Sequence, residues 1–227
     1  MTITHLTDHQ RLGTVALTGA GIGPDEIEEL RTALADLRRN ERDGLIVQAE
    51  PGALHGSHAP PGTALGDWLR ATVHPVLRDL HAAAAPVVIA AQGRVSGLGL
   101  ALCLRADVAV AAEAASFGLG RADNGDWFCG APLHRLAGLG RRAAAELAVH
   151  GREVDAARAV DLGLVTEVAP TSELPAALQR VATRLNALPP GSGSLLARSL
   201  RQAAHLPFDT ALRYDSHLVD ALLAGED

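Results

Sequence analysis

The chain has 227 residues and a net charge of −6, with 48% apolar and only 3% aromatic residues, which suits a folded chain with an aliphatic core and excludes a disordered one. The acidic balance argues against general nucleic-acid binding. All 20 basic residues are Arg, so a Schiff-base Lys is excluded, and an anionic ligand would meet Arg, His or backbone N–H groups.

The first half of the chain alternates strand-like and helix-like segments. Short apolar runs alternate with longer stretches in which apolar residues recur every three or four positions, as on one face of a helix. Pro75 lies inside one helical stretch and is expected to kink or split it. The expected strands are 14–18, 45–49, 86–91 and 108–111, and the expected helices are 24–37, 65–80 and 99–104.

The second half of the chain is mainly helical. Polar, Gly-rich composition predicts a loop at 116–130, as it does at 50–64. We expect an α/β core over residues 1–188 and a helical C-terminal region over 189–227, divided at Pro189-Pro190-Gly191. The expected helices are 141–150, 155–162, 173–187, 193–204 and 208–223, with one strand at 164–168.

The cysteine content and the apolar patterning favour a cytoplasmic location. Cys103 and Cys129 are too few for a disulfide scaffold or a cysteine metal cluster. The first thirteen residues contain no apolar signal region, and no apolar run reaches the length of a membrane span. We therefore expect no membrane partner.

A glycine-rich turn lies in PVVIAAQGRVSGLGLALCLRAD (86–107), between an apolar strand and a short apolar helix. Gly93, Gly97 and Gly99 make a turn of the kind that presents backbone N–H groups to a ligand. The helix that follows carries no acid or base, and its one thiol, Cys103, lies on an apolar helix face where packing is its expected role. Reactive side chains must therefore come from other segments.

From Pro86 onward the sequence resembles the enoyl-CoA hydratase/isomerase (crotonase) family. The three glycines and Asp107 fall on the family's strand–glycine–helix positions, and Ala115-Ser116-Phe117-Gly118 looks like its Ala-x-Phe-Gly. The stretch GREVDAARAVDLGLVTEVAP (151–170) is similar to its Gly-x-x-Ile-x-Ala-x-x-Ala-x-x-x-Gly-Leu-Val-x-x-Val. The resemblance implies a crotonase-like ββα spiral core, a helical region that packs between subunits, a homotrimer or hexamer, and an acyl-thioester ligand.

The family's chemistry implies an oxyanion hole of two backbone N–H groups that hold the thioester carbonyl. Carried over, the donors are the N–H of Leu98, between Gly97 and Gly99, and the N–H of Ser57 in His55-Gly56-Ser57-His58, where the family has Ala-Gly-Ala-Asp. One donor fixed in advance can be worth roughly 3 kcal/mol to a developing oxyanion. Apart from the CoA or phosphopantetheine thioester itself, no cofactor and no metal are expected.

Both glutamates of the family's hydratases are missing. They fall at Ala101 and Arg121 in this chain. Hydration needs one group to activate water and another to deliver a proton. Standard enoyl-CoA hydratase activity is therefore not expected.

Polar residues of the two loops are the remaining candidates. Asp126 is either a relocated general acid/base or the cap of a turn at Asn124-Gly125. His58 either moves a proton near neutral pH or is an exposed loop histidine. Arg121 either binds a substrate carboxylate or turns outward. The candidate catalytic residues are Asp126, His58 and Arg121, and the candidate pocket residues are Gly97, Gly99, Ala101, Asp123 and Trp127.

These observations favour a divergent family member that stabilises the enolate of an acyl thioester. Decarboxylation, double-bond isomerisation and dehydration all remain open, in a biosynthetic pathway. In the family, the last helix closes over the acyl-CoA and can carry a cation for its phosphates. That helix falls beyond residue 227 and the chain has no Lys, so the nucleotide end of CoA has fewer expected contacts. We therefore expect the acyl group to be carried either by CoA or by an acyl carrier protein. Two alternatives stay open: a catalytically silent accessory partner of a polyketide-type synthase, and a hydrolase of C–C bonds in diketones.

Overall fold

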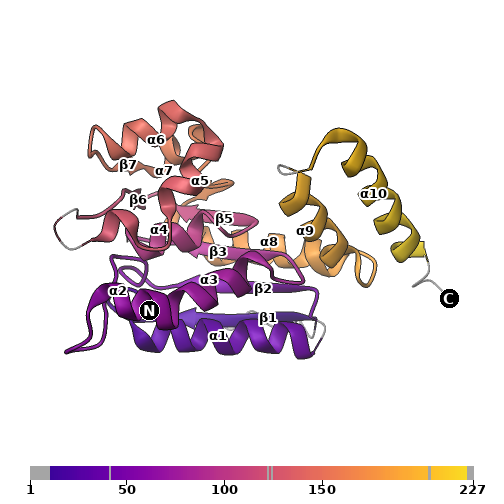
Figure 1. The fold of residues 1–227 in the computed structure, drawn as a ribbon, viewed down its shortest axis with the longest axis horizontal. Coiled ribbons are helices and arrows are strands. Elements are labelled where there is room, and N and C mark those ends of the chain that lie inside the picture. Colours follow the sequence, from indigo (N-terminus) through magenta and orange to yellow (C-terminus); the bar gives the residue numbers. More distant parts are fainter. Residues whose placement is uncertain (1–10, 41, 122, 124, 204–205, 224–227) are drawn as a thin grey trace.

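A five-stranded parallel sheet forms the centre of the molecule in Figure 1, a computed structural model that describes residues 11–223 except 41, 122, 124 and 204–205. Its strand order is β1-β2-β3-β5-β8. A second sheet has the order β4-β6-β7, with β4 parallel and β7 antiparallel to β6. The strands are β1 (Leu12–Leu17), β2 (Gly44–Ala49), β3 (Val87–Ala91), β4 (Arg94–Val95), β5 (Val108–Ala112), β6 (Ser116–Phe117), β7 (Val154–Asp155) and β8 (Glu167–Ala169).

The large sheet is buried on both faces, which explains why its strands read as nearly unbroken apolar runs. All five residues of β3 are buried, and in β2 only Gln48 is partly exposed. One face packs against α1 (Pro24–Arg39), α3 (His74–His81) and α4 (Leu98–Cys103), and the other packs against α8 (Leu174–Asn186). The expected α/β class is confirmed.

Pro75 interrupts the regular α-helix that surrounds it, as expected, although the chain stays helical. The chain forms α2 (Leu65–Trp68), then a π-helical turn over Leu69–Val73, then α3. Val73 and His74 keep right-handed helical angles and the His74 N–H donates to the Leu69 carbonyl, so the π-helical turn is where the hydrogen-bond pattern changes just before Pro75. Val76, Leu77 and Leu80 of α3 are buried against the core.

The C-terminal helices α9 (Ser192–Ala203) and α10 (Phe208–Leu223) form a hairpin that stands away from the sheet in Figure 1. Arg201 anchors α9, because its guanidinium pairs with Asp107 and donates to the carbonyls of Ala83 and Ala85. No residue of α10 is buried. The exposed large apolar residues of the hairpin are Leu196, Leu200, Phe208, Leu212, Val219 and Leu223.

Several elements were not expected from the sequence. The helix α5 (Pro132–Leu139) precedes α6 (Arg141–Ala148) and α7 (Ala156–Asp161), and the short strands β4, β6 and β7 were missed. Two-residue strands carry too little pattern to be read from a sequence. Within the described residues, no helix has the length and apolar character that a membrane crossing requires. The domain boundary at 188/189 and the cytoplasmic location stay predictions.

The parallel sheet brings the candidate loops to one edge. The carboxyl ends of β1, β2 and β3 lie side by side, as the pairing of Leu17 with Ala49 and of Gln48 with Ala90 shows. The segments 18–23, 50–64 and 92–97 leave the sheet at that edge. In open α/β sheets this edge is where ligands bind.

Candidate active site

The turn between β3 and α4 holds two loops in contact. Ser96 is fully buried, and its N–H donates to the Leu54 carbonyl at 3.0 Å. Both the carbonyl and the Oγ of Ser96 accept from the Gly56 N–H, at 3.2 and 3.1 Å. A Cβ on Gly99 would lie 2.0 Å from the Leu54 carbonyl oxygen, so only glycine permits this approach.

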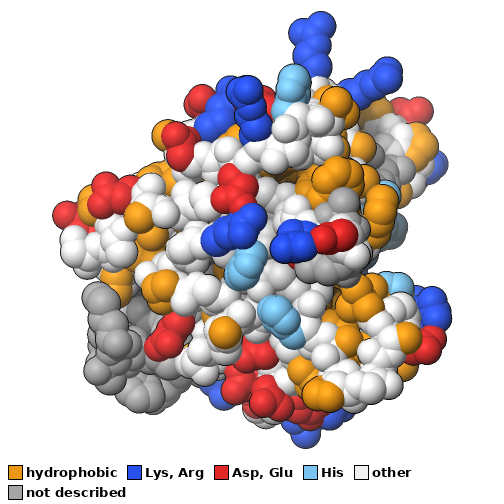
Figure 2. All heavy atoms as spheres, turned by 90° about the vertical axis from the view of Figure 1, so that its left-hand side faces the viewer, with side chains coloured by type: hydrophobic (Ala, Val, Ile, Leu, Met, Phe, Trp, Pro, Cys, Tyr) orange, Lys and Arg blue, Asp and Glu red, His pale blue; other side chains and the backbone are white. Residues whose placement is uncertain are grey.

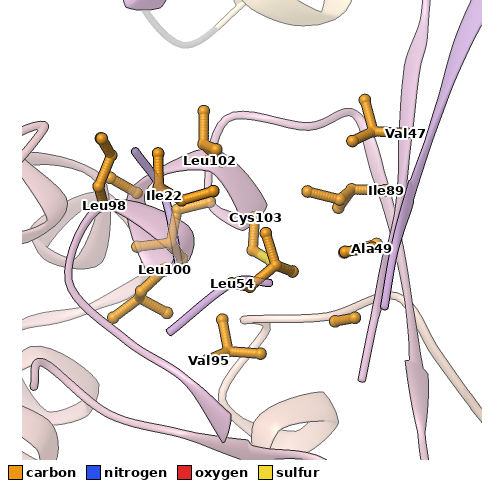
Figure 3. Packing of buried hydrophobic residues seen from close by; sticks show 14 of the residues in the cluster. Ile22, Val47, Ala49, Leu54, Ile89, Val95, Leu98, Leu100, Leu102 and Cys103 are labelled. Atoms are coloured by element: carbon orange, nitrogen blue, oxygen red, sulfur yellow. The ribbon is translucent and has the colours of Figure 1, made fainter. Parts of the chain in front are cut away.

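The helix α4 contributes backbone but no reactive side chain. All six of its residues are buried, and Figure 3 shows Leu98, Leu100, Leu102 and Cys103 among core residues. Ala101, at the family's first glutamate position, packs closely against Gly130: a Cβ added to Gly130 would lie 2.7 Å from the Ala101 Cβ. The space of a glutamate side chain is therefore closed.

The two N–H groups implied as oxyanion donors lie at the contact between the loops. The Leu98 N–H donates to the Oγ of Ser57 at 3.1 Å. The His58 N–H donates to the Ile22 carbonyl at 2.8 Å within a parallel bridge between Ile22 and Ser57. Adjacent N–H groups of an extended segment point to opposite sides, so the Ser57 N–H turns away from Ile22. Among the described residues it has no hydrogen-bond partner.

The Asp126 carboxylate lies beside this contact in a cradle of glycines. Its side chain is only 2% exposed. Cβ atoms placed on Gly97, Gly120 and Gly56 would lie 2.9, 2.8 and 3.7 Å from its carboxylate oxygens. The Arg121 N–H approaches its Oδ2 at 3.4 Å. Gly97 and Gly120, with φ of +55° and +83°, adopt conformations that L side chains rarely reach.

Two histidines border the same cradle. His58 is exposed, and its Nε2 lies 3.5 Å from the Cβ position of Gly56, which is 3.7 Å from Asp126 Oδ2. His55 is half-buried rather than solvent-exposed, because its Nδ1 contacts Ser96 Oγ at 2.8 Å. Since Ser96 Oγ accepts from the Gly56 N–H, its hydroxyl proton is available to His55 Nδ1. Figure 2, which turns the left-hand side of Figure 1 toward the viewer, shows histidine side chains near the middle of that face.

The other candidates are Arg121, Asp123 and Trp127. The Arg121 guanidinium points outward, is 69% exposed and pairs with Asp123, itself 66% exposed. Asp123 pairing holds the pKa of Arg121 above its usual value. Trp127 is half-buried, and its Nε1 donates to the Gly120 carbonyl at 3.0 Å, which fixes the loop beside Asp126. The expected turn at Asn124 lies outside the described residues, and Gly125 has a φ of +86°.

The two cysteines are buried thiols. Burial raises the pKa of Cys103 to about 12, and burial also raises that of Cys129. Cys129 Sγ contacts the Gly125 carbonyl at 3.4 Å, and the nearby Ser57 side chain partly offsets the rise in the pKa of this thiol. In the described part of the chain, no group of three or more His, Cys, Asp or Glu residues is placed to hold a metal ion.

Sequence reasoning missed two contributors to this site and took a third, His55, for an exposed loop histidine. Ser96 links the loops, His55 is held by it, and the side chain of Ser57 occupies the Leu98 N–H. The serine at position 57, where the family has Ala, was the available signal for the last. A cavity of about 550 Å³ beyond the C-terminal end of α4, lined partly by Asp107, His134 and Thr166, contains none of the candidate catalytic residues.

Comparison with solved structures supports the fold. An enoyl-CoA hydratase subunit from Geobacillus kaustophilus superposes with a TM-score of 0.84 at 22% identity, covering 97% of this chain and 89% of that one. An enoyl-CoA hydratase/isomerase family protein from Silicibacter pomeroyi gives 0.81 at 23% identity, covering 94% and 96%. At these identities the likeness shows the fold alone.

Sequence comparison identifies the family. A 1,2-epoxyphenylacetyl-CoA isomerase of Escherichia coli is 29% identical over 206 residues, which is 82% of this chain and 76% of that protein. A short-chain-enoyl-CoA hydratase of Clostridium acetobutylicum is 28% identical over 67% of this chain and 59% of its own length, and two mycobacterial relatives are matched over 58% of theirs. A sequence model of the enoyl-CoA hydratase/isomerase family matches residues 22–227, so the chain belongs to that family.

Proposed function

We propose that this protein is an enzyme that forms an enolate from an acyl thioester and shifts a double bond within the acyl chain. The observation that carries the proposal is the buried Asp126 carboxylate, held against Gly97 and Gly56 beside the N–H groups of Leu98 and Ser57. A base beside oxyanion donors is the pairing that proton abstraction next to a carbonyl requires.

In the proposed reaction the thioester oxygen accepts hydrogen bonds from the Ser57 and Leu98 N–H groups. Asp126 takes a proton from an acyl carbon, and the electron pair of that C–H bond enters the conjugated enolate. Asp126 or His58 then returns a proton to a different carbon, and the double bond moves with no net change in atoms. The backbone around these donors is held by the Ser96 contacts, so the two N–H groups stabilise the enolate oxygen with no movement of the backbone.

The placement of Arg121 favours isomerisation over decarboxylation. Decarboxylation of a malonyl-type group calls for a cation that holds the substrate carboxylate. The Arg121 guanidinium is exposed and engaged by Asp123 instead. The likeness to 1,2-epoxyphenylacetyl-CoA isomerase also supports an isomerase. Dehydration uses the same acid/base pair and remains the second reaction to test. We also propose that the enzyme works in biosynthesis, on CoA or carrier-protein thioesters.

The exposed apolar side of the α9–α10 hairpin supports a homo-oligomer, and we propose a trimer or hexamer. Six large apolar residues of these helices face solvent in the single chain. Exposed apolar area of this extent commonly marks a surface that a partner covers.

The test uses 3-butenoyl-CoA, whose conversion to 2-butenoyl-CoA is followed by the absorbance of the conjugated thioester. The wild-type protein should convert it, and Asp126→Asn should lower kcat by roughly 100-fold or more. Asp161→Asn, which changes a carboxylate that is 69% exposed, should leave the rate unchanged.

The same assay is repeated with the acyl group on a phosphopantetheine carrier. If the wild-type protein turns over neither thioester, the isomerase proposal fails and a silent accessory role is supported.

A further inference from the structure

The Ser57 side chain occupies the place that the proposed function assigns to the substrate oxygen. Its Oγ lies 3.1 Å from the Leu98 nitrogen, a hydrogen bond of ordinary length, and Leu98 is fully buried. The adjacent N–H of Ser57 has no partner among the described residues. One donor of the pair is thus filled by a side-chain oxygen and the other is open.

The hydrogen bonds around this hydroxyl run in one consistent direction. Leu98 N–H donates to Ser57 Oγ, which leaves the hydroxyl proton to be donated onward. Burial raises the pKa of the Cys129 thiol, and the Ser57 side chain acts in the opposite direction, as a hydroxyl directed toward the sulfur would. Cys129 Sγ itself lies 3.4 Å from the Gly125 carbonyl oxygen, which accepts its S–H.

We infer that the Ser57 hydroxyl is a stand-in for the substrate oxygen and that the two exchange places on the Leu98 N–H when a thioester binds. This inference rests on the proposed function. Ser57 is half-buried rather than enclosed in the core. A rotation about χ1 to another staggered position removes Oγ from the Leu98 N–H and leaves the backbone in place.

The exchange keeps the buried Leu98 N–H satisfied in both states. An unpaired buried donor carries a desolvation penalty, so a free enzyme without Ser57 would hold this N–H unpaired or wet. Wild-type protein should therefore prefer ligands with an oxygen at this point less strongly than a variant without the Ser57 hydroxyl does. Wild-type protein can bind a thioether, which lacks that oxygen, with Ser57 still on the N–H.

The experiment compares butanoyl-CoA with its thioether analogue S-butyl-CoA by isothermal titration calorimetry. The two ligands differ only in the carbonyl oxygen. The dissociation constant of S-butyl-CoA divided by that of butanoyl-CoA should rise about fivefold or more in Ser57→Ala, because the bound thioether then leaves the Leu98 N–H without an acceptor. Ser216→Ala, an exposed serine of α10, should keep the wild-type ratio.

The Leu98 amide signal in ¹H–¹⁵N NMR spectra gives a readout independent of affinity. It should move on Ser57→Ala, and it should move in wild-type protein with butanoyl-CoA but not with S-butyl-CoA. If the ratio of dissociation constants in Ser57→Ala stays within twofold of the wild-type ratio, the exchange at Ser57 is overturned while the proposed function stands. Failure of wild-type protein to bind the butanoyl thioester either on CoA or on a phosphopantetheine carrier would overturn the proposed function and the exchange together.

Discussion

Replacing Gly97 by Ala tests the placement of Asp126 over the glycine turn. At φ +55° and ψ −125°, Gly97 has a backbone conformation that costs an L residue about 1–3 kcal/mol. The added methyl would also lie 2.9 Å from Asp126 Oδ1 and 3.2 Å from Gly56 Cα, and such overpacking costs about 1–3 kcal/mol more. Gly97→Ala should therefore destabilise the protein by about 2–6 kcal/mol.

The assay is thermal unfolding followed by circular dichroism. For a chain of this size, 1 kcal/mol moves Tm by about 2–4 °C, so the expected loss is about 5–20 °C. Gly138→Ala is the matched control, since its Cβ position in α5 has no neighbour within 4 Å. That change should leave Tm equal or slightly higher, because Ala favours the helix.

A double-mutant cycle separates backbone strain from the clash with the carboxylate. Asp126→Ala removes the oxygen that the new methyl would meet, so Gly97→Ala should cost about 1–3 kcal/mol less in that background. Additive effects within about 0.5 kcal/mol would show that Asp126 does not lie over Gly97, and the proposed base would lose its position.

Three other contacts of the molecule are open to mutation or chemical modification. Ala101→Glu, which returns the family's glutamate, should destabilise the protein by about 3 kcal/mol or more, because Gly130 closes the space that the longer side chain needs. The variant should not hydrate 2-butenoyl-CoA, and a stable variant that does would contradict this packing. Arg201→Met should cost about 3–5 kcal/mol by leaving Asp107 unpaired, measured by urea unfolding against the exposed Arg198→Met; equal stability of the two variants would refute the anchor. Cys103 and Cys129, with pKa values raised by burial, should resist iodoacetamide at pH 8 until denatured, whereas alkylation of the native protein, seen by mass spectrometry, would show them accessible.

Most of the fold could be predicted from periodicity and breakers. Continuous apolar runs marked β2, β3 and β5, the four apolar residues on one face marked α1, and Pro75 marked the interruption before α3. The helix α5 was missed although Pro132 stands at its start, because its N-cap residue Ala131, at φ +53°, has no side chain that can cap a helix. The strands β4, β6 and β7 depend on tertiary pairing that two residues cannot signal.

The candidate site was predictable as a set of loops and less so as a set of roles. Asp126 and His58 were named from the sequence, and they border the same Gly56 position. The outward turn of Arg121 could not be read, because it depends on its pairing with Asp123 two residues away. Whether a side chain faces the site or solvent is a tertiary fact, and for Ser57 the sequence suggested only a backbone donor.

The most direct test of the account is exchange of the α-protons of butanoyl-CoA in deuterium oxide, followed by ¹H NMR. This exchange needs only a base and a stabilised enolate oxygen, so it does not depend on the natural acyl group. Wild-type protein should introduce deuterium at the carbon next to the carbonyl, and Asp126→Asn should slow the exchange by roughly 100-fold or more. Equal exchange rates for the two proteins, or none with wild type, would contradict the assignment of Asp126 as the base beside the Ser57 and Leu98 donors.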